Sequence, residues 1–229
     1  MDEKKIQGLS AEASKELAEQ CGNRQHVYGF LSRVFAREVD AQLVGECAGG
    51  WSVAFDDEAL TGAFANVREQ IAACDEAGIE DAAVDFNRVF FGMGPIAAEK
   101  AFPYESVYTS DGGLMMQDAY SSAVVEYRAA GFAKDPRFTE PEDHIAVELS
   151  YMAARCERAQ AALCRGDEGA AEEELRAQQA FLRSHLLSWV DRFAEDVKRA
   201  AQLSLYADAS ACAAAFLHAD AALLDEVIE

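Results

Sequence analysis

Acidic and imidazole side chains gather in one short segment, EPEDH at positions 140–144. An Asp beside a His can orient the ring as a base, for instance toward the hydroxyl of Ser106 or Tyr108. Carboxylates can also bind the guanidinium groups of a cationic peptide through charge-assisted hydrogen bonds. A third interpretation is structural, because carboxylates at a helix start complement the helix dipole. On the residues alone, a polar helix cap is favoured over a catalytic dyad.

The cysteines and histidines are dispersed along the chain. No pair of the six cysteines has the C-x₂₋₄-C spacing of zinc or iron–sulfur sites, and no two of the four histidines form an H-x-x-x-H pair. We therefore expect no resident metal and no resident cofactor, and we interpret the cysteines as small buried hydrophobes. The sequence also lacks the glycine-rich phosphate-binding motifs and the G-x-S-x-G turn of hydrolases.

A helix start should position the acidic segment. Thr139 and Glu142 form a T-x-x-E capping box, which predicts a helix from Pro141 to about Arg165. Glu148 lies one turn after the histidine of EPEDH, so it should share a helix face with that ring and hold it in place.

Apolar residues recur at helical spacing along most of the chain, whereas the alternation of a strand is hard to find. This pattern predicts an all-α fold built as a compact globular helical bundle. The expected helix separators are Gly45, Gly49–Gly50, Gly78 and Gly166. The apolar stripes consist of Val27, Phe30, Leu31, Val34 and Phe35; Leu60, Phe64, Val67 and Ile71; Ile145, Leu149, Met152, Cys156, Ala159 and Leu163; Leu175, Leu182, Leu186, Trp189, Phe193 and Val197; and Phe216, Leu217, Leu223, Leu224 and Val227.

All four prolines lie between positions 95 and 141, where the helical rhythm breaks. This part of the chain should contain long loops that carry aromatic residues, and such loops are often functional. A core-packed Ω-loop is the alternative. Residues 131–143 form poor helix and should act as a hinge, with any flexibility concentrated before Thr139.

Composition excludes several classes of function. The chain has 229 residues, 51% of them hydrophobic, and a net charge of −21, so nucleic acids and anionic lipid surfaces should repel it. The longest stretch without a charged residue, 209–219, is too short to cross a membrane. The charged N-terminus does not resemble an export signal, which makes the cytoplasm the expected location.

Four blocks of the sequence occur in a familiar order: FNRVFFGMGP (86–95), FPYESVY (102–108), EPEDHIAVELSYM (140–152) and SHLLSWVDRF (184–193). They resemble the successive signature blocks of the TorD/DmsD-type redox-enzyme maturation chaperones, and the resemblance covers roughly residues 20 to 220. One departure is the segment Phe91-Gly92-Met93-Gly94, where the family more often has a Gly-Pro-rich turn.

The resemblance implies a cytoplasmic all-helical chaperone that is not an enzyme. Such a chaperone binds the twin-arginine signal peptide and the apoprotein of a molybdenum or tungsten bis-pterin oxidoreductase of the dimethyl-sulfoxide-reductase type, assists cofactor loading and delays export. Some members also bind guanine nucleotide or form domain-swapped dimers, so either a monomer or a swapped dimer is expected. The family's peptide site corresponds here to Val89, Phe90, Pro103, Tyr104, Glu140, Asp143 and His144.

The resemblance also suggests how the chain is divided. A single chaperone domain over 1–229 would have a larger N-terminal part at about 1–135, the hinge at about 131–143, and C-terminal helices at about 141–229.

The groups that a receptor for such a peptide requires agree with this interpretation. Two adjacent guanidinium groups followed by an apolar segment require carboxylates beside a hydrophobic groove. Two other functions stay open on the residues alone: a generic helical interaction module, and a small-molecule enzyme that uses Asp143 and His144. The expected carboxylates are Glu140, Glu142 and Asp143, and the expected groove residues are Phe90, Phe91, Phe102 and Tyr104.

Overall fold

The structure is a computed structural model that describes residues 6, 8–50, 53, 55–94 and 99–228. The described residues form helices and no strands, which confirms the predicted all-α fold. The helices are α1 (Ala11–Ala36), α2 (Ala41–Ala48), α3 (Glu58–Ala72), α4 (Glu76–Phe90), α5 (Glu105–Thr109), α6 (Asp118–Ala129), α7 (Ile145–Cys164), α8 (Glu168–Ser184), α9 (Leu186–Ala200) and α10 (Ser204–Ile228).

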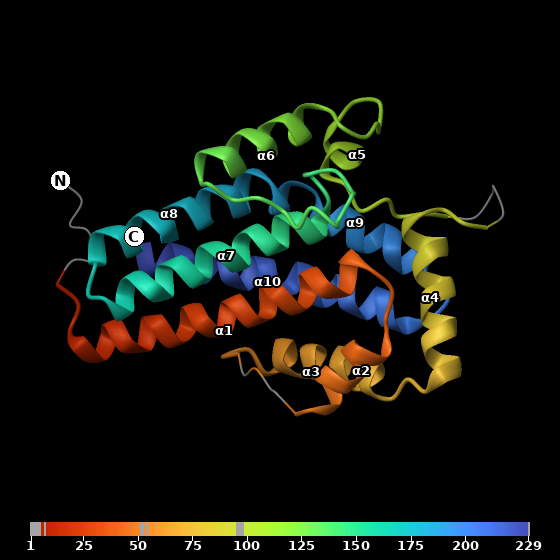
Figure 1. Cartoon of the computed structure of the whole chain (residues 1–229), viewed down its shortest axis with the longest axis horizontal. Coiled ribbons are helices and arrows are strands. Elements are labelled where there is room, and N and C mark those ends of the chain that lie inside the picture. The colour runs from red at the N-terminus through yellow and green to blue at the C-terminus, as the bar shows by residue number, and fades with distance from the viewer. Residues whose placement is uncertain (1–5, 7, 51–52, 54, 95–98, 229) are drawn as a thin grey trace.

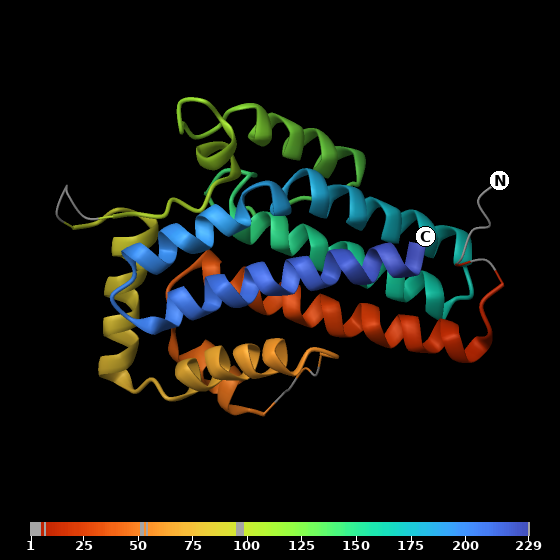
Figure 2. The ribbon, with the colours of Figure 1, turned by 180° about the vertical axis from the view of Figure 1, so that it is seen from behind.

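Long helices form the body of the molecule. Helix α1 packs along α7, α7 also contacts α8, and α10 packs against α9 and α3. Figure 1 shows α5 and α6 on one side of this body, α2 and α3 on the opposite side, and α4 across one end. The view from behind in Figure 2 shows α10 running along the body near α1. The first and last long helices therefore belong to one packed unit.

The apolar stripes form the core. Every predicted stripe residue on α1, α3 and α7 is buried. The fourth stripe divides between α8 and α9, because the backbone leaves helical geometry at His185. On α10, Leu223 and Val227 are only half-buried. Helical periodicity thus identified the faces that the fold buries.

Helix ends follow local chemistry in most places. The side chains of Ser10, Asp40, Asp57, Asp75 and Asp167 each accept a hydrogen bond from a backbone N–H in the first turn of the helix that follows. Gly49 caps the end of α2, and Gly166 follows α7 with a φ of +71°. Gly45 and Gly78 lie inside α2 and α4, so the prediction that they separate helices was wrong.

The start of α7 also differs from the prediction. The helix begins at Ile145, and its N-cap is His144 with an extended backbone (φ −74°, ψ 136°). The proposed capping box of Thr139 and Glu142 does not form, because the backbone N–H of Ile145 donates to Pro103 O, 2.9 Å away. A contact between distant segments therefore moves the start of α7 about one turn later in the sequence than predicted.

The proposed division of the chain at a hinge stays a prediction. Gly131 follows α6 with a φ of +62°, which favours glycine at that turn. Helix α1 lies on one side of this division in sequence and packs along α7 on the other. A hinge movement that released the C-terminal helices would therefore have to separate α1 from α7.

A buried ion pair joins the first helix to the last. Asp220 on α10 accepts hydrogen bonds from the guanidinium of Arg24 (Nη2 to Oδ2, 2.9 Å) and from the Tyr28 hydroxyl (2.6 Å), both on α1. Arg24 and Asp220 are both buried, so removal of one partner leaves a charge without compensation in the core.

We expect Asp220→Ala to lower the free energy of unfolding by roughly 3–5 kcal/mol, because it leaves the Arg24 guanidinium buried without a compensating charge. The double variant Arg24→Met/Asp220→Leu removes both charges and should recover most of this loss. Urea unfolding of the two variants and the parent chain measures both values. A double variant no more stable than the single one would show that the charge is not the cause.

Candidate functional site

Two signature segments that lie far apart in sequence pair through their backbones. The N–H of Glu105 donates to Asp143 O at 2.9 Å, and the N–H of Ile145 donates to Pro103 O at the same distance. Tyr104 and His144 form an antiparallel bridge between these bonds. We call the paired residues 102–106 and 140–145 the junction. The PYES and EPEDH blocks therefore form one structural unit.

Asp143 fixes the start of α5 within the junction. Its buried carboxylate accepts a hydrogen bond from the backbone N–H of Ser106 at 3.0 Å. Ser106 in turn accepts one from the backbone N–H of Gln117, 3.0 Å away, which anchors the loop before α6. Burial raises the pKa of Asp143, while the hydrogen bonds from Ser106 oppose that shift. Asp143 is thus a structural acceptor in the folded chain.

The His144 ring is a buried helix cap. Its Nδ1 accepts a hydrogen bond from the backbone N–H of Ala146 at 3.0 Å, which assigns the ring proton to Nε2. Tyr104 and Phe138 contact the ring edge to face, with centroids 5.2 and 5.1 Å away. Burial, together with the charge of Lys134, lowers the pKa of His144 to about 3, so the ring is neutral at physiological pH.

This geometry does not match a catalytic dyad. In such a dyad the carboxylate accepts from the imidazole Nδ1–H. Here His144 uses Nδ1 to accept from the backbone, and Asp143 contacts Ser106 instead of the ring. The expectation that Glu148 holds the His144 ring was also wrong, because Glu148 accepts a hydrogen bond from the indole of Trp189.

Tyr104 connects the buried junction to its surface. The hydroxyl donates to Glu140 Oε2 at 2.5 Å, and burial together with this bond raises the pKa of Tyr104. Glu140 and Glu142 are half-buried. Lys134 Nζ lies 3.4 Å from Glu142 Oε1 and also donates to Glu140 O. At the outer edge of the junction, one carboxylate and one backbone carbonyl therefore hold the Lys134 ammonium, and the Glu140 carboxylate is held by Tyr104.

Two residues of the expected peptide site lie beneath the surface on α4. Val89 and Phe90 are buried, and the Phe90 ring packs against an aromatic cluster. The N–H of Ala101 donates to Val89 O at 2.9 Å, which brings the chain back to the end of α4. The rings around Phe90 are those of Phe35, Phe86, Phe193 and Tyr206.

Accessibility divides the expected site residues into two groups. Glu140 is half-buried and can meet a partner directly. Of the expected groove residues, Phe91 and Phe102 are exposed, by 41% and 36%. Contact of the remaining residues with a peptide stays a prediction, and it requires the junction to open. These buried residues are Val89, Phe90, Pro103, Tyr104, Asp143 and His144.

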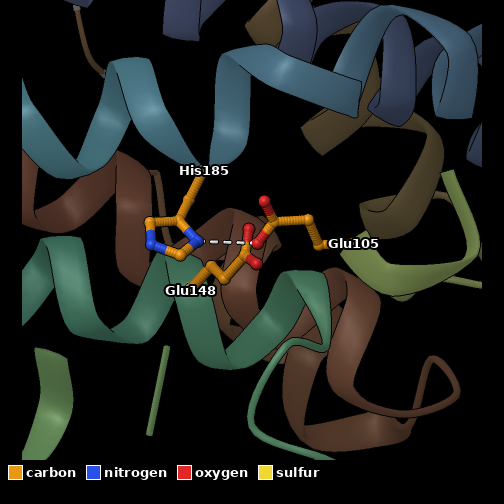
Figure 3. Close-up of side chains that lie close together, drawn as sticks. All are labelled: Glu105, Glu148 and His185. Atoms are coloured by element: carbon orange, nitrogen blue, oxygen red, sulfur yellow. Dashed lines mark hydrogen bonds and ion pairs between the residues drawn. The ribbon is translucent and has the colours of Figure 1, made fainter. Parts of the chain in front are cut away.

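Sequence reasoning missed a second cluster behind the junction. Figure 3 shows Glu105 of α5, Glu148 of α7 and His185, at the break between α8 and α9, with their polar ends together. His185 Nδ1 lies 2.7 Å from Glu105 Oε2, and Trp189 Nε1 donates to Glu148 Oε2 at 3.2 Å. All three residues lie in signature blocks, one in each of three blocks, but no spacing rule joins residues about 40 positions apart.

The neutral state of His144 predicts a pH dependence of stability. The pKa of His144 is about 3 in the folded chain, against an ordinary value of 6.5. Between these two pH values the ring is protonated in the unfolded chain and neutral in the folded chain. This contribution is fully present above pH 6.5. As the pH falls toward 3, it decreases by up to about 1.4 kcal/mol per pH unit.

His144→Asn should remove this component, because an amide oxygen can still cap α7 but does not titrate. Urea unfolding between about pH 4 and pH 7 compares the slopes of the variant and the parent chain. His218→Asn replaces an exposed histidine beside Asp191 and is the control for substitution of a histidine outside the junction. Equal slopes for all three proteins would refute the role assigned to His144.

None of the helices in the described part of the chain combines the length and the apolar character that a membrane crossing requires.

A family model described as the nitrate reductase delta subunit matches residues 55–195. This range contains all four signature blocks, the junction and the cluster behind it.

Individual relatives match over most of the chain. The chaperone protein TorD of Photobacterium profundum is 30% identical over 209 residues, covering 88% of this chain and 94% of the relative. The chaperone protein TorD of a Vibrio cholerae serotype O1 strain is 29% identical over 216 residues, covering 90% and 94%. The chain therefore belongs to the TorD family of redox-enzyme maturation chaperones.

Proposed function

We propose that this chain acts in the cytoplasm on a molybdenum or tungsten bis-pterin oxidoreductase of the dimethyl-sulfoxide-reductase type. It binds the twin-arginine signal peptide and the apoprotein of that enzyme, assists cofactor loading and delays export until folding is complete. Membership of a chaperone family supports the general role. The chemistry of the junction supports the peptide ligand.

The main support for this proposal is the combination of groups at the outer edge of the junction. Glu140 and Glu142 present carboxylates at the surface, and Phe102 exposes a ring two residues before Tyr104, the hydrogen-bond partner of Glu140. A twin-arginine signal combines two guanidinium groups with an apolar segment, so it needs these two kinds of contact side by side. The net charge of −21 attracts such a cationic segment from a distance.

The junction already binds one cation of its own chain. Lys134 reaches Glu142 and the Glu140 carbonyl, and its ammonium lies where an incoming guanidinium would find the same acceptors. Arginine offers more donors than lysine, in a planar fork that suits carboxylates. We therefore expect an arginine of the peptide to displace Lys134 from Glu142.

The buried residues of the expected site have a different part in this proposal. Asp143 and His144 hold the backbone pairing through Ser106 and Ala146, and Tyr104 orients Glu140. Val89, Phe90 and Pro103 are buried as well. While the junction stays paired, these residues position the binding edge and Glu140 contacts the peptide. Direct contact of the buried residues with the peptide, which the resemblance implies, would require the junction to open.

Calorimetric titration tests the proposal with a twin-arginine signal peptide from the same organism and the same peptide with both arginines replaced by glutamine. Glu140→Gln and Glu142→Gln should each weaken binding about ten-fold at low salt, equivalent to about 1.4 kcal/mol. Added salt should weaken binding by the parent chain, because ion pairing contributes.

Asp135→Asn is the matched control. It removes one exposed carboxylate from the same loop, at a position where Asp135 pairs with Arg137 and not with Lys134. Its affinity should match that of the parent chain. If the control weakens binding as much as the glutamate variants do, net charge is responsible and not the junction. If the arginine-free peptide binds equally well, the chain is a generic helical interaction module.

A further inference from the structure

We infer that Glu105, Glu148 and His185 form a binding site for one divalent first-row transition ion. This inference departs from the expectation of no resident metal, which rested on cysteine and histidine spacing and did not consider two glutamates with one histidine. We call this set the buried triad. Its three residues come from α5, from α7 and from the break between α8 and α9 (Figure 3). The inference concerns a site behind the junction and does not depend on the proposed peptide ligand.

The buried triad brings three ligand atoms together. One carboxylate oxygen from each glutamate and one ring nitrogen of His185 all lie within 4.8 Å of one another. Ligand atoms about 2.1 Å from a tetrahedral ion are about 3.4 Å apart, so the widest pair, at up to 4.8 Å, must close by up to about 1.4 Å. Rotation of the three side chains must supply that movement when an ion binds.

Burial makes compensation of the two carboxylates necessary. The exposed fractions of Glu105, Glu148 and His185 are only 3%, 0% and 6%. Two carboxylates that face each other away from water require a compensating cation or proton. Glu148 Oε1 is buried, and no N–H or hydroxyl group of the described residues donates to it; the neighbouring carboxyl group of Glu105 lies within hydrogen-bond reach of the Glu148 carboxyl group. Glu148 Oε1 is therefore available as a ligand.

The surroundings of the buried triad resemble the outer shell of a metal site. Trp189 Nε1 donates to Glu148 Oε2 at 3.2 Å, and Ser188 Oγ lies 3.4 Å from Glu105 Oε1. Ser122 Oγ lies 3.4 Å from His185 Nε2, the ring nitrogen that faces away from Glu105. Groups of this kind fix the orientation of ligating carboxylates and imidazoles.

The donor set indicates the class of ion. One imidazole nitrogen with carboxylate oxygens suits Zn²⁺, Mn²⁺ or Fe²⁺. A divalent ion would neutralise the two carboxylates beside a neutral His185 ring. It would also connect α5, α7 and the α8–α9 break. Because the triad is enclosed, the ion should enter during folding and should leave slowly.

The test uses the full-length chain without an affinity tag, expressed in media supplemented separately with Zn²⁺, Mn²⁺ or Fe²⁺ and purified without chelator. Elemental analysis should find about one ion per chain for at least one of these metals. Glu148→Gln keeps the acceptor for Trp189 but weakens the ligand, and His185→Gln removes the ring. Both variants should lose the ion or bind it more than about 100-fold more weakly.

His218→Gln is the matched control, because His218 pairs with Asp191 at the surface and could hold an adventitious ion. This variant should keep the full metal content. Metal content below about a tenth of an ion per chain in all three media would overturn the inference and leave a shared proton in the triad. Metal that persists in Glu148→Gln and His185→Gln, or that disappears in His218→Gln, would overturn it as well.

Discussion

Backbone pairing between residues 103–105 and 143–145 is the contact on which the functional part of this molecule depends. The hydrogen bonds from Glu105 to Asp143 and from Ile145 to Pro103 hold two loops in one register. Buried backbone groups must find partners, so these bonds resist opening more strongly than contacts at the surface do. The start of α7, the start of α5 and the placement of the acidic edge all follow from this pairing.

In the junction, the residues that hold the structure together are different from the residues that are accessible to a partner. Asp143 and His144, the residues with the most distinctive chemistry, are buried and each accepts a backbone hydrogen bond, whereas Glu140 and Glu142 reach the surface. This arrangement lets a helical chaperone present carboxylates in a fixed position without exposing its core. Under the proposed function, substitutions at the buried residues would weaken peptide binding by displacing the outer edge of the junction.

Local patterns in the sequence predicted the fold more completely than they predicted the arrangement of the candidate site. The stripe from Val27 to Phe35 is a repeat within a single helix, so periodicity alone predicted which face is buried. The start of α7 was predicted wrongly, because the competing bond comes from Pro103, about 40 positions earlier. Burial of the expected site residues and the meeting of Glu105, Glu148 and His185 depend equally on long-range packing. The resemblance located the blocks, but it did not indicate which of their side chains face outward.

Under the proposed function, the junction stays paired while its outer edge binds the peptide. Amide hydrogen exchange with and without a twin-arginine signal peptide tests this directly. We expect the amides of Glu105 and Ile145 to be strongly protected in the free chain and to remain so, while added protection appears at residues 134–142. Rapid exchange at Glu105 and Ile145 in the free chain, or new protection confined to other helices, would contradict it.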